Sequence, residues 1–307
     1  MQTTAPLVTI GLPVYNGART LGEALDSLLA QTYPGFELVL SDNGSTDETE
    51  SMCRRYAARD ERIRYCRSDR NRGAAWNFRR VVELARGSYF KWAAHDDLCA
   101  SRFLECCVGV LEREPSVVLC YPKTMVIDEQ GAPVRESIQA CALRSARASH
   151  RLRQVLEGLG LSDPMFGVTR TEVLRSTPLI GPFPGSDTVL LAELALRGEV
   201  YEWPERLFFR RDHGGKSNRA HPTLAGLASW YDPENDRRLV LPTWRRLRGH
   251  IASIARVPMP RAERAACLWY MARWVRWNAP ELGVELRLAA VRLMQRTHHR
   301  RPSRAEA

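Results

Sequence analysis

The chain has 307 residues, of which 44% are hydrophobic and 26% are charged, and these values are ordinary for a globular protein. They exclude a disordered or fibrous chain, and the length predicts a main domain with a long extension or a second lobe. The formal net charge of +10 at pH 7 favours a polyanionic partner, such as nucleic acid, a phosphorylated substrate or an anionic membrane surface.

The N-terminal segment begins with alternating strand and helix patterns. Residues 7–16 form a run rich in β-branched side chains that ends near a proline, which predicts a buried strand. Apolar residues at helical spacing over 21–29 predict a helix, and 36–40 predict a second strand. A polar turn and another helix follow, and the spacing of Ser45 and Glu48 predicts a capping box at the start of that helix.

The alternation continues with a third strand over 62–66, a third helix over 76–85 and a fourth strand over 89–94. This alternation of strands and helices predicts a parallel sheet covered by helices. Ligands of these sheets bind beyond the carboxyl ends of the strands. Polar residues lie at or just beyond the end of each predicted strand, namely Tyr15, Asn16, Ser41, Asp42, Asn43, Asp69, Asp96 and Asp97.

The middle of the chain is less regular. Residues 117–134 predict a hairpin, 144–159 a helix, and 165–175 a strand that turns into a helix. A loop rich in proline and glycine precedes a helix that starts near Asp187, and 200–218 predict a final strand and a basic loop.

The composition shifts near residue 221 towards arginine, tryptophan and alanine at helical spacing. We therefore expect a main domain over 1–220 and a helical extension over 221–307, with a frayed tail. Tryptophans among arginines suit a helix on an anionic bilayer, and helices that pack over the main domain are an equal alternative.

The eight cysteines contain no CxxC pair and no zinc-like cluster with histidine, which predicts reduced core thiols in a reducing compartment. The N-terminus lacks the features of a signal peptide, and no apolar run approaches the roughly 20 residues of a spanning helix. We expect a cytoplasmic protein, with peripheral contact at the inner face of the membrane as a further option. The lysines are Lys91, Lys123 and Lys216, and this excess of arginine is also typical of a GC-rich genome.

Asp96 and Asp97 end an apolar strand, where adjacent carboxylates repel one another unless a cation neutralises them. Mg²⁺ or Mn²⁺ is commonly held by one or two carboxylates together with substrate phosphates. Two alternatives remain: Asp97 or Ser101 caps the next helix, or the pair lies in a solvated turn.

Other polar positions also admit two interpretations. The turn at Asp42 leads into a helix N-terminus. Asp42 can accept a hydrogen bond from a base or a ribose, or the segment is a simple turn. Arg72 can contact a phosphate or lie on the surface. Asp187 can act as a base or cap its helix. The basic residues Arg211, His213 and Lys216 can close over a diphosphate or form a solvated loop.

Together these segments resemble family-2 glycosyltransferases, which are inverting enzymes of the GT-A fold. The resemblance rests on TIGLPVYNGART, the QTYPGFELVLSDNGSTDET segment, NRGAAWNF and the HDD triplet, and it extends through GSDTVLLAELALRGE and FFRRDH. It covers about the first 220 residues and implies a Rossmann-like, mostly parallel sheet flanked by helices.

The resemblance also implies roles for single residues. Pro13 to Asn16 line the base, Asp42 bonds to it, Asp97 binds a Mg²⁺ or Mn²⁺ ion that bridges the diphosphate, and Asp187 is the catalytic base. The nucleotide-sugar site as a whole comprises Pro13, Val14, Tyr15, Asn16, Asp42, Asn43, Gly44, Ser45, Arg72, Asp96, Arg211 and His213.

The chain departs from the family pattern at two points. The acidic motif is His95-Asp96-Asp97 where many members have Asp-x-Asp, so the role of His95 is open. The acceptor motif is Ser186-Asp187 where many members have Glu-Asp.

The resemblance implies a metal-dependent transfer of a sugar from a UDP-, dTDP- or GDP-linked donor to a saccharide or lipid-linked acceptor, in bacterial cell-surface polysaccharide or glycoconjugate synthesis. One alternative is a nucleotidyltransferase that makes nucleotide-sugars, but its Gly-rich loop with lysine is missing here. Another is a basic module that binds a membrane or nucleic acid. The sequence contains no nucleic-acid-binding motif, so we expect no nucleic-acid partner.

Overall fold

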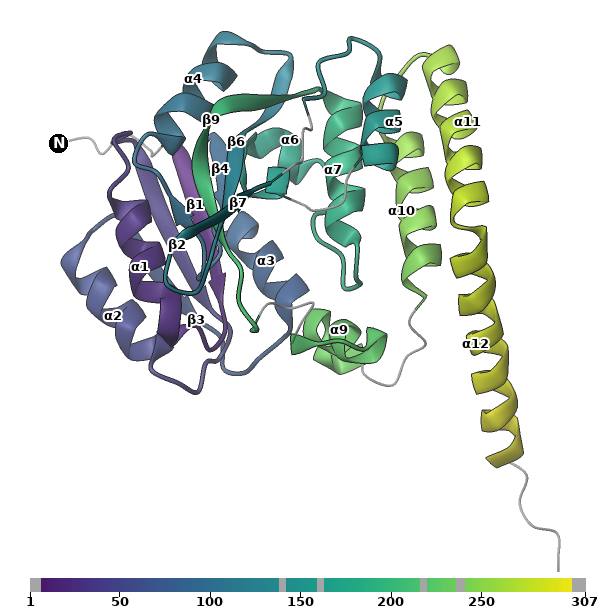
Figure 1. Ribbon diagram of the computed structural model, residues 1–307, viewed down its shortest axis with the longest axis horizontal. Helices are drawn as coiled ribbons and strands as arrows, with labels where there is room; N and C mark the ends of the chain where they lie inside the picture. Colours follow the sequence, from purple (N-terminus) through teal and green to yellow (C-terminus); the bar gives the residue numbers. More distant parts are fainter. Residues whose placement is uncertain (1–6, 138–141, 159–162, 216–219, 236–240, 300–307) are drawn as a thin grey trace, which may run out of the picture.

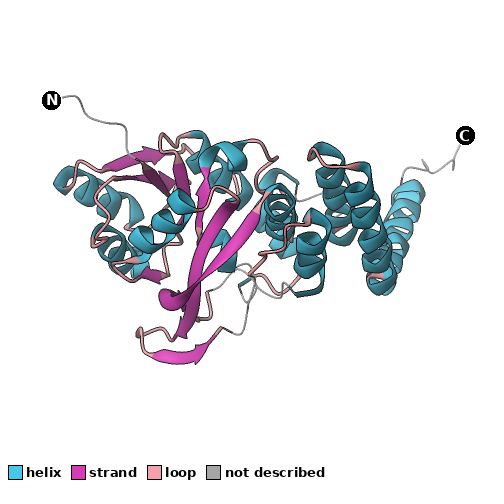
Figure 2. Cartoon of the chain, turned by 90° about the horizontal axis from the view of Figure 1, so that it is seen from above, coloured by secondary structure: helices cyan, strands magenta, loops and turns pink. Residues whose placement is uncertain are grey.

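The structure is a computed structural model that describes residues 7–137, 142–158, 163–215, 220–235 and 241–299. Its centre is a nine-stranded sheet with the strand order β3-β2-β1-β4-β8-β6-β9-β5, and β7 pairs with β6. Helices cover both faces of this sheet, and a layer of C-terminal helices lies beyond one of its sides (Figures 1 and 2). The predicted α/β class is confirmed.

The N-terminal half of the sheet is parallel, as predicted. Its strands are β1 (Val8–Val14), β2 (Phe36–Asp42), β3 (Ile63–Arg67) and β4 (Tyr89–Trp92). The β1 strand is buried along its whole length because strands flank it on both sides and helices cover both faces of the sheet. It continues through Pro13, which lies beyond the last β1–β4 pair at Gly11 and Trp92, so a residue without an N–H interrupts no ladder on that side.

The remaining strands include both orientations. They are β5 (Leu98–Cys99), β6 (Val117–Ile127), β7 (Pro133–Glu136), β8 (Val168–Arg170) and β9 (Glu199–Arg211). The predicted hairpin is confirmed as the antiparallel β6–β7 pair. The short β8 strand is antiparallel to both β4 and β6, whereas β6 and β9 are parallel along most of their length.

The helices of the first half begin within a few residues of their predicted positions. They are α1 (Ala18–Leu29), α2 (Thr49–Arg59), α3 (Ala74–Glu83) and α4 (Phe103–Arg113). The predicted capping box is wrong: α2 begins after Glu48 without a side-chain cap. The hydroxyl of Ser45 instead accepts a hydrogen bond from the Asn16 amide at 3.0 Å, which ties this loop to the end of β1.

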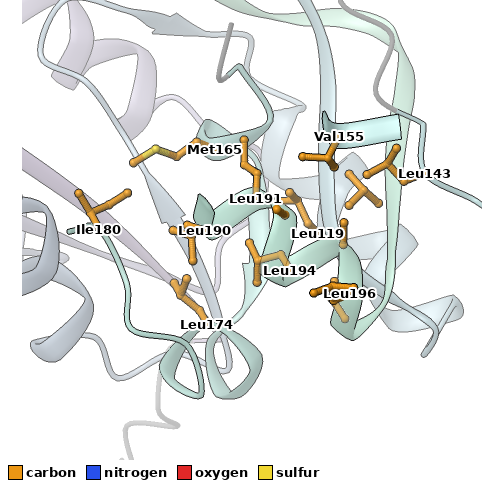
Figure 3. Packing of buried hydrophobic residues seen from close by; sticks show 14 of the residues in the cluster. Leu119, Leu143, Val155, Met165, Leu174, Ile180, Leu190, Leu191, Leu194 and Leu196 are labelled. Atoms are coloured by element: carbon orange, nitrogen blue, oxygen red, sulfur yellow. The ribbon is translucent and has the colours of Figure 1, made fainter. Parts of the chain in front are cut away.

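Two apolar clusters lie on opposite faces of the sheet. One joins α1 and α4 to the strands, and the other joins α3, α5 (Ala148–Gly158) and α7 (Ser186–Arg197). Figure 3 shows the centre of the second cluster, where Leu190, Leu191 and Leu194 of α7 pack towards Leu119 of β6 and Val155 of α5. Short segments η1 (Asp163–Phe166) and α6 (Thr171–Arg175) flank β8, as the predicted strand-to-helix pattern requires.

The residues after 220 are helical, as predicted, in α9 (Leu224–Tyr231), η2 (Pro233–Asn235), α10 (Pro242–Arg256), α11 (Arg261–Trp277) and α12 (Ala279–His299). Ile254, Cys267 and Trp274 belong to the same apolar cluster as α7. The predicted boundary near residue 220 stays a prediction. None of the described helices is long and apolar enough to cross a membrane.

The described cysteines are free thiols, and all except Cys66 are buried. Burial raises the pKa of the Cys53 thiol to about 12 and that of Cys267 to about 11, so both are protonated near neutral pH. These residues form part of the core, as predicted, while Cys141 lies outside the described residues.

A buried carboxylate joins α7 to α10. Glu193 is 1% exposed and accepts hydrogen bonds from Ser253 at 2.7 Å, from Arg256 at 2.5 Å and from Arg197 at 2.8 Å. Removing one member of a buried ion pair leaves its partners with an uncompensated charge. Glu193 therefore fixes the position of the C-terminal helices on the apolar face of α7.

We predict that Glu193→Ala lowers the free energy of unfolding by about 3 kcal/mol. Urea denaturation followed by circular dichroism measures this change. The matched control is Glu157→Ala, whose carboxylate is 36% exposed and lies 3.7 Å from Arg273, and which is expected to lose less than about 1 kcal/mol. Equal losses in the two variants would contradict the assignment.

Candidate functional site

A cleft of about 970 Å³ opens beyond the carboxyl ends of the parallel strands. This is the position that the strand order predicts for a ligand site. The cleft collects residues from the ends of β1, β2 and β4, from η1 and from the segment around α9. The predicted site residues that line it are Pro13, Val14, Tyr15, Asn16, Asn43, Asp96 and Asp97.

The turn after β1 and the loop after β2 hold one another in place. The Asn16 amide donates to Ser45 Oγ, and the Asn16 side-chain oxygen accepts from the Thr46 amide at 2.9 Å. Asn16 has a φ of 51°, in the left-handed region that asparagine tolerates better than most residues. Tyr15 is 41% exposed at the mouth of the cleft, and its ring therefore offers a flat apolar surface to a ligand.

Asp42 is fully buried beneath this loop. One of its oxygens accepts from the Ser45 amide at 2.9 Å, and the other accepts from the Tyr65 hydroxyl at 2.9 Å and from Arg67 at 3.2 Å. Burial and then this carboxylate raise the pKa of Tyr65 well above its usual value. Asp42 does not line the cleft, so it shapes the loop, and its contact with a base stays a prediction.

Asparagines complete the floor of this side of the cleft. Asn43 donates to Asn71 at 2.9 Å and to the Gly73 carbonyl, while its oxygen accepts from the Arg72 amide. Asn77, which we did not predict as a site residue, bonds to the Ser41 side chain at 2.6 Å and to the Ser41 carbonyl at 2.8 Å. The signal for Asn77 was its place one helical turn after Gly73, at the start of α3.

Two glycines allow the loops to approach closely. Gly44 has a φ of +74°, and a Cβ there would lie 2.6 Å from the Arg70 carbonyl carbon. Gly73 has a φ of +86°, and a Cβ there would lie 2.5 Å from the Tyr231 carbonyl oxygen. Gly44 does not line the cleft, and its predicted contact with a nucleotide stays a prediction.

The acidic turn is fixed from the last strand of the sheet. The Arg211 amide of β9 donates to Asp97 Oδ1 at 2.9 Å, and His213 Nε2 lies 2.8 Å from Asp96 Oδ2. Because His213 Nδ1 accepts from the Gly215 amide at 3.2 Å, the proton of a neutral His213 is on Nε2 and points to Asp96. The alternative in which Asp97 or Ser101 caps the next helix is wrong, because α4 begins after Arg102 without a side-chain cap.

The Arg211 side chain is turned away from the cleft. It is 1% exposed and donates to the Asp96 carbonyl at 3.0 Å, to the Glu129 carbonyl at 2.7 Å and to Glu23 at 2.5 Å. These partners occupy the guanidinium, so Arg211 positions the acidic turn in this structure. Its predicted contact with a diphosphate stays a prediction. Lys216, the third residue of the predicted basic loop, lies outside the described residues.

Arg72 also lies outside the cleft. It donates to Asp69 at 2.9 Å and to Ser68 at 3.2 Å, and its guanidinium lies 5.1 Å from the centre of the Trp76 ring. Its predicted contact with a phosphate stays a prediction. His95, whose role the sequence left open, lines the cleft, and its ring packs on Gly17, where a Cβ would lie 2.6 Å from the ring.

The cleft lining also contains a buried ion pair that sequence reasoning missed. Asp163 of η1 is 4% exposed and accepts from Arg210 at 2.5 Å and from Ser137 at 2.8 Å. Phe166 and Asp212 also line the cleft. Arg210 immediately precedes Arg211, so alternation along β9 directs one side chain to the cleft wall and the other to the opposite face.

The segment around α9 covers part of the cleft, with Ser229 and Trp230 in its lining. Tyr231 follows directly in the chain, and burial and then Asp187 raise the pKa of its hydroxyl. Asp187 lies in the first turn of α7 after the N-cap residue Gly185, and its Oδ1 accepts a hydrogen bond from the Thr188 amide at 2.9 Å. It does not line the cleft, and its role as a base stays a prediction.

Residues 9–172 match the family model described as glycosyl transferase family 2. An uncharacterized glycosyltransferase of Rickettsia felis is 35% identical over 158 residues, which is 50% of this chain and 25% of that protein. This chain therefore spans well under two thirds of the length of that relative.

Two solved structures share the fold. TarS 1-349 of S. aureus in complex with UDP-GlcNAc has a TM-score of 0.63 at 17% identity, over 91% of this chain and 79% of that one. A mannosyltransferase from Pyrobaculum calidifontis in complex with GDP-Man and Mn²⁺ has a TM-score of 0.52 at 19% identity, over 95% and 81% of the two chains.

We predict that Arg211→Met lowers the free energy of unfolding by about 3 kcal/mol, because the Asp96 and Glu129 carbonyl groups lose a buried, charged donor. Urea denaturation measures this change. The control is Arg206→Met on the same strand, where the side chain is 39% exposed and paired with Glu136, and the expected loss is below about 1 kcal/mol. A loss of that size in Arg211→Met would show that the buried contacts contribute little.

Proposed function

This chain belongs to glycosyl transferase family 2, and we propose that it transfers a sugar from a nucleotide-diphospho-sugar to an acceptor hydroxyl. The observation that carries this proposal is the arrangement of Asp96 and Asp97 in the same cleft as the β1–α1 turn and Asn43. An aromatic and amide-lined pocket beside two carboxylates suits a nucleoside on one side and a diphosphate on the other.

The proposed donor site has two parts, one for the base and one for the ribose or the sugar. Tyr15, Asn16 and Asn43 are proposed to contact the base, because they combine an exposed ring with amide groups. Asp96 is proposed to approach the ribose or the sugar, and its bond to His213 restricts its rotation. The UDP-GlcNAc and GDP-Man complexes of the two structural neighbours support a nucleotide-sugar as the ligand of this fold.

A divalent cation is proposed as the cofactor, either Mg²⁺ or Mn²⁺. Among the described residues no three His, Cys, Asp or Glu side chains gather into a metal cluster. Mg²⁺ is often bound by one or two carboxylates with substrate phosphates at the other positions, so Asp97, with Asp96 beside it, fits such an ion. When bound, the ion supplies positive charge to a departing diphosphate. The Mn²⁺ complex of the Pyrobaculum neighbour supports this assignment.

The acceptor hydroxyl needs a carboxylate that takes its proton, since its pKa lies far above neutral. Asp187, in the first turn of α7, is the proposed base. Asp212 is the alternative candidate for the base, because it lines the cleft. Attack from the face opposite the leaving nucleotide inverts the anomeric carbon, and no covalent enzyme intermediate is required.

The wider setting is proposed from the family. We propose a UDP-, dTDP- or GDP-linked donor, a saccharide or lipid-linked acceptor, and a part in cell-surface polysaccharide or glycoconjugate synthesis on the cytoplasmic side. The nucleotidyltransferase alternative predicts a nucleotide-sugar as product rather than substrate. Incubation with a nucleotide-sugar or with a nucleoside triphosphate and a sugar phosphate distinguishes these reactions, because only the transferase releases a nucleoside diphosphate.

We predict that one of UDP, GDP and dTDP raises the melting temperature of the protein, and that most of this rise needs Mn²⁺. Asp97→Asn should remove the Mn²⁺-dependent part, since asparagine keeps an oxygen for the Arg211 amide but loses the charge. A thermal-shift panel with and without Mn²⁺ measures this. Glu61→Ala, at an exposed carboxylate, should behave as the wild type, and a wild type that responds to no nucleotide would overturn the donor site.

We predict that Asp187→Asn lowers the turnover number on the order of 10²- to 10⁴-fold, the usual effect of removing a positioned proton acceptor, and leaves nucleotide affinity unchanged. Release of the nucleoside diphosphate measures turnover. Asp212→Asn is the comparison. If Asp212→Asn loses turnover and Asp187→Asn does not, the base is reassigned to Asp212.

A further inference from the structure

The α11 and α12 helices form a long rod at the margin of the molecule farthest from the β1–β3 edge of the sheet (Figures 1 and 2). The hydrogen-bond pattern continues across their junction, because Asn278 donates to the Trp274 carbonyl and Leu282 donates to the Asn278 carbonyl. The helical phase therefore carries over from one helix to the next. The rod is nearly one helix.

Every third or fourth residue from Arg261 to Val291 is exposed, in a single row that includes Trp269, Arg276, Val284 and Arg287. We call this row, with its flanking residues Leu268, Trp277 and Leu288, the outer row. It runs for about 45 Å at the rise of an α-helix. Trp269 is 64% exposed and Leu288 is 54% exposed.

The inner face of the rod is already packed. Cys267, Met271 and Trp274 are buried against α5 and α10, and Leu282 is 5% exposed. A surface helix usually has one apolar face and one polar face. This rod has apolar side chains on both, so packing within the chain explains the inner face and leaves the outer row without a partner in the described structure.

The charged side chains along the outer row indicate which kind of partner it suits. Arg261, Arg276 and Arg287 are exposed along it, whereas Glu281 is the acidic side chain that is exposed between residues 261 and 291. Of the other acids in this stretch, Glu263 is held by Ser149 and Arg147, and Glu285 is buried. The row is thus apolar and cationic.

We propose that the outer row binds the surface of an anionic lipid bilayer. Tryptophan rings suit the headgroup region because they are apolar with one polar edge, and arginines pair with lipid phosphates. A helix of this composition lies in the plane of the interface with its apolar side chains among the acyl chains. A second copy of the chain fits less well, because it would bring the same arginines to both sides of the interface.

The test uses the full chain and vesicles of phosphatidylcholine, with or without an equal part of phosphatidylglycerol. We expect co-sedimentation with the anionic vesicles, weakened by salt, and little with the neutral ones. The double variant Arg276→Glu with Arg287→Glu should lower the partition coefficient by at least about tenfold, and Trp269→Ser with Trp277→Ser should also lower it. The measurement needs no sugar donor, so it is independent of the proposed activity.

The control is Arg55→Glu with Arg59→Glu, which makes the same charge change on exposed residues of α2 and should bind as the wild type. Circular dichroism confirms that each variant is folded. Equal binding to both vesicles, no binding to either, or an unchanged Arg276 and Arg287 variant would overturn the proposal. So would a concentration-dependent dimer in sedimentation velocity that the two tryptophan substitutions dissociate.

Discussion

The hydrogen bond from the Arg211 amide to Asp97 is the contact on which the geometry of the cleft depends. It connects the turn after the fourth strand to the end of the last strand, across a separation of more than a hundred residues. The Arg211 side chain secures the same turn from beneath through the Asp96 carbonyl. Two adjacent carboxylates that repel one another are thereby held in one conformation before any cation or ligand binds.

Sequence patterns predicted most of what local periodicity determines. The first four strands and their helices were predicted because an apolar run and a helical repeat are each contained within a few residues. The polar residues after these strands were found for the same reason, and seven predicted residues line the cleft. The capping box failed because the Ser45 hydroxyl is occupied by the Asn16 amide, a contact between segments that no local pattern reports.

The parts of the site that were missed depend on pairings distant in the chain. Asp163 and Arg210 are ordinary polar residues in the sequence. Their pairing is seen only in the structure, where Arg210 Nη1 lies 2.5 Å from Asp163 Oδ1. Arg210 and Arg211 are adjacent and chemically identical. The Arg211 guanidinium donates to two backbone carbonyls and to Glu23, whereas Arg210 lines the cleft. The pleat of β9 and its register with β6 determine which of the two arginines faces the cleft. Neither the pleat nor the register is visible in composition.

The apolar cluster beneath α7 has a consequence for the synthesis of the protein. Its members extend from Val39 to Trp274, so the ribosome must release the chain through Trp274 before that cluster can close. The opposite cluster draws on residues from Val8 to Phe208, and it can close earlier. The nascent chain therefore carries an uncovered apolar helix surface while α10 and α11 are translated, a state in which chaperones bind and premature termination leads to aggregation.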